Sequence, residues 1–136
     1  MRKFFILVPA AILLLAAYDP TDAERAGWTM GDMNSWRIAL SAYKQDNGKF
    51  PDAKTLEEAR AAIEPKYIGR TPMHDAWGTP YRYEQDGKGG FRLVSAGADG
   101  KFQPEGWAEV GRTKDLKADA VATGEGRWLQ RSWQTW

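Results

Sequence analysis

An apolar stripe at helical spacing follows residues 22–46 and constrains the fold more than any other feature. Its members recur at steps of three or four residues: Ala26, Met30, Met33, Trp36, Leu40 and Tyr43. Thr21 and Glu24 have the spacing of a capping box, which satisfies free amide groups at a helix start. Asn47 and Gly48 accept the left-handed conformation at a helix end. The pattern predicts one long helix over 22–46 whose narrow stripe packs against a sheet.

The remaining elements are shorter. Thr55 and Glu58 repeat the capping-box spacing and open a second helix that Pro65 ends. Alternating residues and turn sequences then predict four strands, over residues 81–84, 91–95, 119–122 and 127–130. Residues 96–117 are expected to be mostly irregular. This order predicts an α+β fold, in which a long N-terminal helix packs on a small antiparallel β-sheet.

The N-terminus has the features of a targeting segment. Arg2 and Lys3 precede a run of apolar residues that ends in two alanines. A short basic region, an apolar run and small residues are typical of a secretory signal peptide. The run is shorter than the roughly 20 residues of a membrane-spanning helix, but an uncleaved anchor is the alternative interpretation. We therefore expect a signal peptide or short membrane anchor over residues 1–17 and one globular domain over residues 18–136.

Composition excludes several kinds of site. The 19 basic and 18 acidic residues nearly balance and form no run of one sign, so the sequence does not indicate a nucleic-acid partner. Cysteine is absent, which excludes disulfides, thiolate metal sites and cysteine nucleophiles. His74 is the single histidine, and no G-x-S-x-G motif surrounds Ser95, so the sequence does not support a triad of these residues with Asp75. We expect a protein that is not an enzyme.

The segment from Ala96 to Asp119 is rich in oxygen ligands. Its acidic residues are Asp99, Glu105, Glu109, Asp115 and Asp119. Gly97 and Gly100 leave its backbone free to turn carbonyl groups inward. Hard cations such as Ca²⁺ take about six to eight oxygen ligands from carboxylates and carbonyls, but Asp and Gly are also common in ordinary turns. The composition therefore leaves both a cation site and a plain polar loop open.

Four tryptophans in the C-terminal part of the chain allow two interpretations: Trp107, Trp128, Trp133 and Trp136. They could form an exposed aromatic surface for a sugar or a partner. Alternatively, Trp128 lies in the core and the tail is partly frayed, which is the interpretation that we favour.

Three stretches resemble motifs of one protein family. Residues 39–51 (ALSAYKQDNGKFP) are similar to the end of the long helix in the major pseudopilins of type II secretion systems. Residues 75–81 (DAWGTPY) resemble their D-P-W-G-x-P-Y turn, and residues 95–100 (SAGADG) resemble the S-x-G-A-D-G element that opens their calcium loop. Asp119 stands where the family has an aspartate near the end of that loop. The order and spacing of the motifs extend the resemblance over residues 22–133.

The resemblance implies a non-enzymatic structural subunit of a periplasmic pseudopilus, which helps to move folded proteins outward. Its partners would be other pseudopilin-like or secretion-system proteins, including copies of itself, and it would meet the membrane through an uncleaved N-terminal segment alone. Carried over residue by residue, the Ca²⁺ ligands are Ala96 through its carbonyl oxygen, and Asp99 and Asp119 through their carboxylates. Asp115 is an alternative ligand at the distal end of the loop.

The N-terminus departs from the family pattern. The family has a glycine cleavage point, then a phenylalanine, and a glutamate at the fifth mature position; here Lys3 precedes Phe4, and Val8 stands at the fifth place. Ala76 also replaces the proline of the turn motif. These differences leave a second function open: a stand-alone periplasmic binding module that keeps the pseudopilin fold but does not polymerise.

We predict that export removes the apolar segment near Ala16 or Ala17, because basic, apolar and small residues follow one another as in a cleaved signal peptide. Intact-mass spectrometry of the protein from expressing cells would give the mature N-terminus. A protein that starts at Met1 and is extracted only with detergent would establish the membrane anchor instead.

Overall fold

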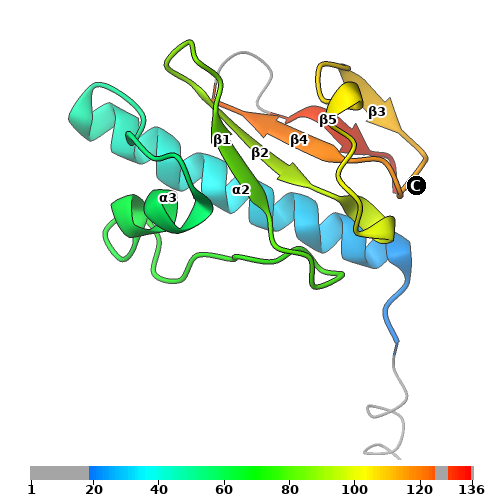
Figure 1. Cartoon of the computed structure of the whole chain (residues 1–136). Coiled ribbons are helices and arrows are strands. Elements are labelled where there is room, and N and C mark those ends of the chain that lie inside the picture. The colour runs from blue at the N-terminus through cyan, green and yellow to red at the C-terminus, as the bar shows by residue number, and fades with distance from the viewer. Residues whose placement is uncertain (1–18, 125–128, 136) are drawn as a thin grey trace, which may run out of the picture.

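The computed structural model describes residues 19–124 and 129–135. The expected targeting segment lies outside these ranges, as do Trp128 and Trp136. None of the helices in the described ranges is long and apolar enough to cross a membrane. The described residues form a long helix, α2, and a short helix, α3, with a sheet packed against them (Figure 1).

Helix α2 (Asp22–Asn47) confirms the first prediction to within one residue. Its capping box is complete, because the Thr21 hydroxyl accepts from the Glu24 amide at 3.2 Å and the Glu24 carboxylate accepts from the Thr21 amide at 2.8 Å. At the other end Gly48 has a φ of 80° and donates its amide to the Lys44 carbonyl at 2.8 Å. Local sequence therefore determines both ends of this helix.

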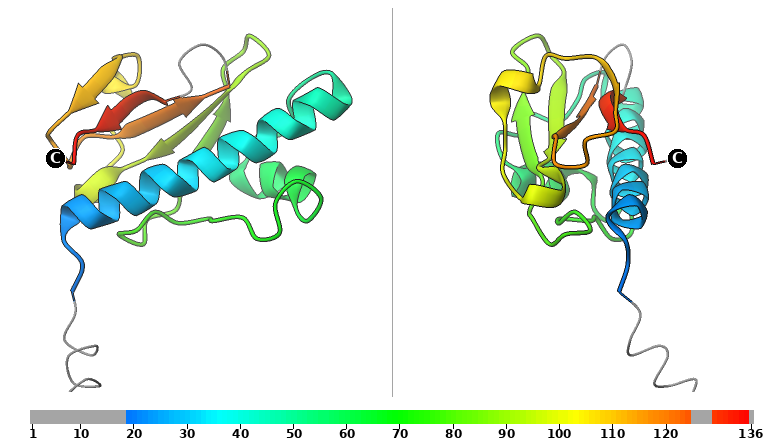
Figure 2. Two further views of the ribbon diagram at one scale, coloured as in Figure 1. Left: turned by 180° about the vertical axis from the view of Figure 1, so that it is seen from behind. Right: turned by 90° about the vertical axis from the view of Figure 1, so that its right-hand side faces the viewer.

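The predicted stripe of α2 forms the centre of the core. Ala26, Met33, Trp36 and Leu40 are fully buried, and Met30 and Tyr43 pack at its margins. The Trp36 indole donates to the Pro72 carbonyl at 2.6 Å, and its ring stacks on Tyr83 of the sheet with 6.4 Å between centroids. Figure 2 shows α2 running along one face of the sheet.

Within the described residues, five strands form one sheet in the order β1-β2-β4-β5-β3. The strands are β1 (Arg82–Gln85), β2 (Phe91–Ser95), β3 (Gly111–Thr113), β4 (Ala120–Thr123) and β5 (Leu129–Trp133). β1, β2, β4 and β5 pair antiparallel, but β3 pairs parallel with β5. The sheet is therefore mixed, and the expectation of a purely antiparallel sheet is wrong at this edge.

Strand β3 lies inside the stretch that we expected to be irregular. It has three residues, none of them a large apolar residue, so it carries no alternating pattern. Its pairing partner is far along the chain, with Gly111 opposite Arg131 and Thr113 opposite Trp133. The Gln134 amide extends the pairing by donating to the Thr113 carbonyl at 2.7 Å. Such a strand depends on its neighbour rather than on its own sequence.

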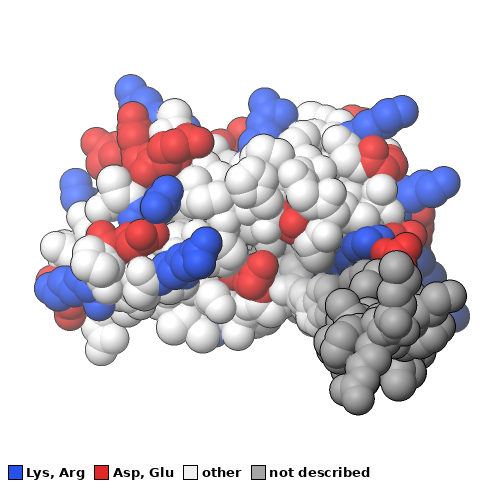
Figure 3. All heavy atoms as spheres, turned by 90° about the horizontal axis from the view of Figure 1, so that it is seen from below, with Lys and Arg blue, Asp and Glu red and all other residues white. Residues whose placement is uncertain are grey.

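Helix α3 (Leu56–Ile63) lies beside α2 and next to β1 (Figure 1). The Thr55 hydroxyl accepts from the Glu58 amide at 3.2 Å, as predicted. The Glu58 carboxylate bonds to the Lys54 amide at 2.8 Å, so only half of the expected capping box forms. The buried side chains of α3 close the end of the core: Leu56, Ala59 and Ile63. Figure 3 shows basic and acidic side chains interspersed on the face seen from below, around a mostly uncharged centre.

We predict that Trp36→Ala lowers the free energy of unfolding by about 3–5 kcal/mol, because it removes a fully buried indole and leaves a cavity. Urea unfolding followed by circular dichroism would measure the change. Trp28→Ala is the matched control on the same helix: Trp28 is 51 % exposed, so we expect a change within about 0.5 kcal/mol. Equal effects of the two substitutions would contradict the assignment of the buried face.

Candidate functional site

The loop between β2 and β4 starts and ends at one place. Ser95 at the end of β2 pairs with Ala120 at the start of β4. Ala96 and Asp119, the predicted first and last metal ligands, therefore lie directly beyond the ends of two paired strands. Between them the chain forms two short 3-10 helices, η1 (Gly97–Asp99) and η2 (Pro104–Gly106), before β3. The expectation that this stretch is irregular therefore holds only in part.

Asp119 is the most buried carboxylate of the loop, with 1 % of its surface exposed. Its Oδ2 accepts hydrogen bonds from the Gln103 amide at 2.6 Å and from the Trp107 indole at 2.7 Å. Among the described residues, no donor reaches its buried Oδ1. Burial raises the pKa of Asp119, the bonds from Gln103 and Trp107 lower it, and the nearby charge of Asp99 raises it. One oxygen of this carboxylate is thus held in place and the other is unsatisfied.

The other predicted ligands lie in different surroundings. Ala96 is fully buried at the start of η1. Asp99 is partly exposed, and its Oδ1 accepts from the Lys101 amide at 2.9 Å. Asp115 is exposed, and its Oδ1 accepts from the Lys117 amide at 3.0 Å, as in an ordinary turn. Within the described part of the chain, no three acidic or histidine side chains are grouped as metal ligands.

Gly97 lets the two ends of the loop meet. It has a φ of +74°, and a Cβ at this position would lie 2.6 Å from the Leu116 carbonyl oxygen and 2.8 Å from that of Ala118. The next amide, of Ala98, donates to the Leu116 carbonyl at 2.8 Å. The loop therefore needs glycine here for two reasons, the backbone conformation and the close approach of two carbonyls.

A buried hydrogen bond joins two of the three motifs that resemble the pseudopilin family, the turn over residues 75–81 and the start of the loop at residues 95–100. The Ser95 hydroxyl donates to Asp75 Oδ2 at 2.8 Å and accepts from the Gly97 amide at 3.3 Å. The other oxygen of Asp75 accepts from the amides of Trp77 at 3.1 Å and Thr79 at 3.0 Å. The turn over residues 75–81 is thereby attached to the start of the loop. Sequence analysis placed both residues in motifs but missed their contact, because no local pattern records it.

No catalytic triad forms from these residues. Ser95 bonds directly to Asp75, so the histidine that a triad places between them is not there. His74 is exposed, and its backbone pairs with Pro80. The Ser95 hydroxyl is fully buried and serves to position backbone groups.

The two described tryptophans of the C-terminal part, Trp107 and Trp133, do not belong to an exposed aromatic surface. Trp107 is 5 % exposed and Trp133 is 1 % exposed. Trp133 packs edge-on against Trp77 with 5.5 Å between centroids and donates to the Ala118 carbonyl at 2.8 Å. Trp77 in turn donates to Asp22 Oδ1, at the start of α2, at 2.8 Å. The expectation of a frayed tail is wrong for Trp133, because this residue is part of the core.

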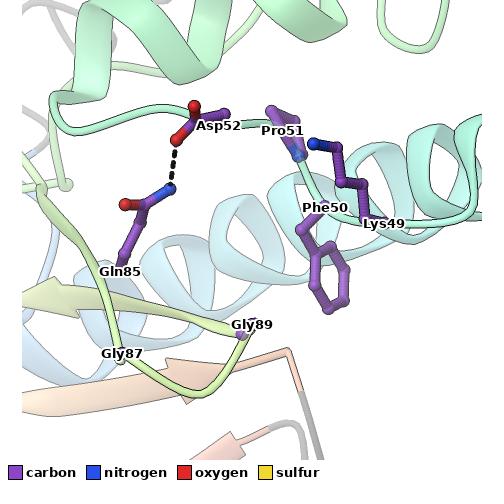
Figure 4. Close-up of a pocket in the computed structure, with 8 residues that line it drawn as sticks. Lys49, Phe50, Pro51, Asp52, Gln85, Gly87 and Gly89 are labelled. Atoms are coloured by element: carbon purple, nitrogen blue, oxygen red, sulfur yellow. Dashed lines mark hydrogen bonds between the residues drawn. The ribbon is translucent and has the colours of Figure 1, made fainter.

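A hollow of about 420 Å³ lies away from the loop, between residues 49–52 and the β1–β2 hairpin (Figure 4). Gln85 points across it and donates to Asp52 Oδ1 at 3.1 Å. Three glycines of the hairpin line its other side. The carboxylate and amide that face the hollow thus bond to each other, and they offer no arrangement for catalysis.

Comparison with known proteins decides the family. Residues 17–113 match the model of the family described as type II secretion system (T2SS), protein G. The chain belongs to this family. It is also 34 % identical over 104 residues, 68 % of this chain and 72 % of the relative, to type II secretion system core protein G of Pseudomonas aeruginosa. The resemblance to the major pseudopilins is confirmed, and with it the assignment to structural pseudopilin subunits of type II secretion. The family match includes Ala96 and Asp99 but ends before Asp115 and Asp119.

We predict that Gly97→Ala lowers the free energy of unfolding by about 2 kcal/mol more than Gly87→Ala. Both glycines have positive φ, +74° and +76°, so both substitutions carry the conformational cost of about 1–2 kcal/mol. A Cβ at Gly87 meets nothing within 4 Å, whereas one at Gly97 meets two carbonyl oxygens. Thermal denaturation of both variants would measure the difference, and equal costs would show that the loop ends do not need this close approach.

Proposed function

We propose that this protein is an exported, non-enzymatic structural subunit or interaction protein of a type II secretion pseudopilus-like system, and that Ca²⁺ stabilises its 96–119 loop. Membership of the protein G family supports the structural role. The proposed partners are other secretion-system proteins and copies of this chain, and the proposed location is the periplasm or its inner-membrane boundary.

The unsatisfied oxygen of Asp119 carries the calcium proposal. A buried charged oxygen without a partner costs free energy, since it has lost water and gained nothing in return. A cation beside Oδ1 would offset this cost while Oδ2 keeps its two donors. The charge of Asp99 raises the pKa of Asp119, so the two carboxylates are near enough to repel each other. Such repulsion is relieved when both face one cation.

The remaining ligands fit a hard cation by their chemistry. Ca²⁺ binds backbone carbonyl oxygens as well as carboxylates, and Ala96 supplies a carbonyl directly after β2, whose last residue pairs with the neighbour of Asp119. We assign Ala96, Asp99 and Asp119 as ligands. Asp115 remains the alternative, but it is exposed, whereas Asp99 is partly buried and its charge acts on Asp119. When bound, the ion would supply the positive charge that offsets the carboxylates, and the fold would hold the ligand oxygens in place.

We predict that Ca²⁺ raises the melting temperature and protects the loop from protease, and that Mg²⁺ does so less. A ligand specific for the folded state contributes about 2.7 kcal/mol at 100 times its dissociation constant. Asp99→Ala and Asp119→Ala should each remove most of the gain, whereas Asp115→Ala should retain it. A loss of the gain in Asp115→Ala alone would move the distal ligand to Asp115. No response of the wild-type protein to chelation would exclude the calcium proposal and leave the structural role standing.

The gain from Ca²⁺ should also grow with pH. Burial raises the pKa of Asp119 above its usual value, so the folded protein without metal holds this proton more tightly than the unfolded chain. Its stability therefore falls as pH rises from the unfolded pKa through the raised one. Ca²⁺ needs the deprotonated carboxylate, so its stabilisation increases over the same window. In Asp119→Asn the melting temperature should lose this response to calcium.

The sequence of the N-terminus supports the second function, a stand-alone periplasmic binding module that does not polymerise. Val8 occupies the place of the family's glutamate, and Lys3 that of the cleavage-point glycine. A signal-peptidase cut near Ala17 would leave a domain that begins just before α2, without an apolar segment for a filament core. The stand-alone periplasmic module would then be the correct function, so the mature N-terminus decides between the two.

A further inference from the structure

The face of the sheet opposite α2 is covered by the loop that contains η2. Figure 2 shows α2 on one side of the sheet and this loop on the other. Trp107, at the end of η2, packs with Phe102 on Val94 of β2 and Val121 of β4. Arg82 lies opposite Val94 in the β1–β2 ladder, and Arg92 lies opposite Glu84. Polar and apolar side chains thus meet around one indole ring.

Two guanidinium groups stack on this indole. The Arg82 guanidinium carbon lies 5.5 Å from the centroid of Trp107 and 5.7 Å from that of Phe102. The guanidinium carbon of Arg92 lies 5.8 Å from the Trp107 centroid. Trp107 is held at two points, because its indole N–H donates to Asp119 at 2.7 Å and its backbone carbonyl accepts from the Gln130 side chain at 2.6 Å. A guanidinium over an aromatic face keeps the N–H groups at its edge available for an anion.

One arginine of this cluster has no ion-pair partner in the described part of the chain. Arg92 forms an ion pair with Glu84 at 2.6 Å, and Arg131 forms one with Glu109 at 3.1 Å. Arg82 is exposed, and among the described residues no carboxylate lies within ion-pair distance of it. The Arg92 Nε also has no acceptor among these residues. Arg82 is therefore an arginine without an ion-pair partner within the described ranges, and Arg92 has a buried donor without an acceptor there.

We propose that Arg82 and Arg92, stacked on Trp107, bind a carboxylate from an acidic segment of a partner protein. The planar fork of a guanidinium matches the two oxygens of a carboxylate. One arginine without an ion-pair partner suits a monoanion better than a phosphate dianion. Arginine and tryptophan fixed together are the residue types that dominate protein interfaces. This surface goes beyond the proposed function, because it requires neither polymerisation nor calcium.

An acidic peptide tests the site directly. The ¹⁵N-labelled protein, in low salt with EDTA, is titrated with acetylated and amidated tetraglutamate while the Trp107 indole N–H resonance is followed. We expect a saturable shift that weakens with added salt, as exposed charges are screened. Arg82→Gln should lower the affinity at least tenfold. Arg70→Gln removes an equal charge from an exposed arginine in the loop after α3 and should change the affinity less than twofold.

Two further variants separate a binding site from a structural stack. Glu84→Gln releases Arg92 from its ion pair and should tighten peptide binding severalfold. If the arginines only hold Trp107 in place, this substitution should give no gain in affinity. Arg82→Lys keeps the charge but loses the fork, so its affinity should stay severalfold below wild type. An absent shift, an unchanged affinity in Arg82→Gln, or no gain in Glu84→Gln would overturn the proposal. Inorganic phosphate that binds as tightly as the peptide would identify a small-anion site instead.

Discussion

The antiparallel pairing of Ser95 with Ala120 is the constraint on which the candidate site depends. It closes a long loop, and closing a loop costs conformational entropy. Contacts within the loop do not have to offset this cost alone. The ladder between β2 and β4 and the burial of this sheet against α2 contribute that free energy instead. Ala96 and Asp119 are therefore brought together by the core and not by the loop sequence. A cation would act on a site whose ends are already placed.

Sequence analysis predicted what local chemistry determines. The bounds of α2 follow from a capping box, an apolar stripe and a glycine at its end, and β2 has its predicted bounds because a glycine-rich turn sequence directly precedes it. The position of β3 was not predictable, since three residues without an apolar pattern become a strand only beside β5. Asp75 was placed in its motif, yet its bond to Ser95 joins segments that no periodicity relates. The ligand set remains a prediction, with Asp119 the residue whose surroundings fit it best.

Asp119 links the two functional proposals through its two oxygens. Oδ1 faces the proposed cation, while Oδ2 holds the Trp107 indole on which Arg82 and Arg92 stack. The proposed metal ligands and Trp107 lie on one loop, whereas Arg82 and Arg92 lie on β1 and β2, and the carboxylate of Asp119 would contribute to the order of both sites. The experiments on them are nevertheless independent, since the peptide titration is done without calcium.

The contact of Trp77 with both Asp22 and Trp133 gives the domain a defined mechanical corner. One side chain, that of Trp77, joins the first turn of α2 to the last strand there. The turn over residues 75–81, which contains Trp77, also contacts the start of the loop through the hydrogen bond from Ser95 to Asp75. Figure 1 shows the end of β5 close to the beginning of α2. A force applied to the segment that precedes α2 would therefore be transmitted to the domain at this corner. Tension would reach the 96–119 loop and β5 first, whereas the turn between β1 and β2 lies at the opposite end of these strands (Figure 1).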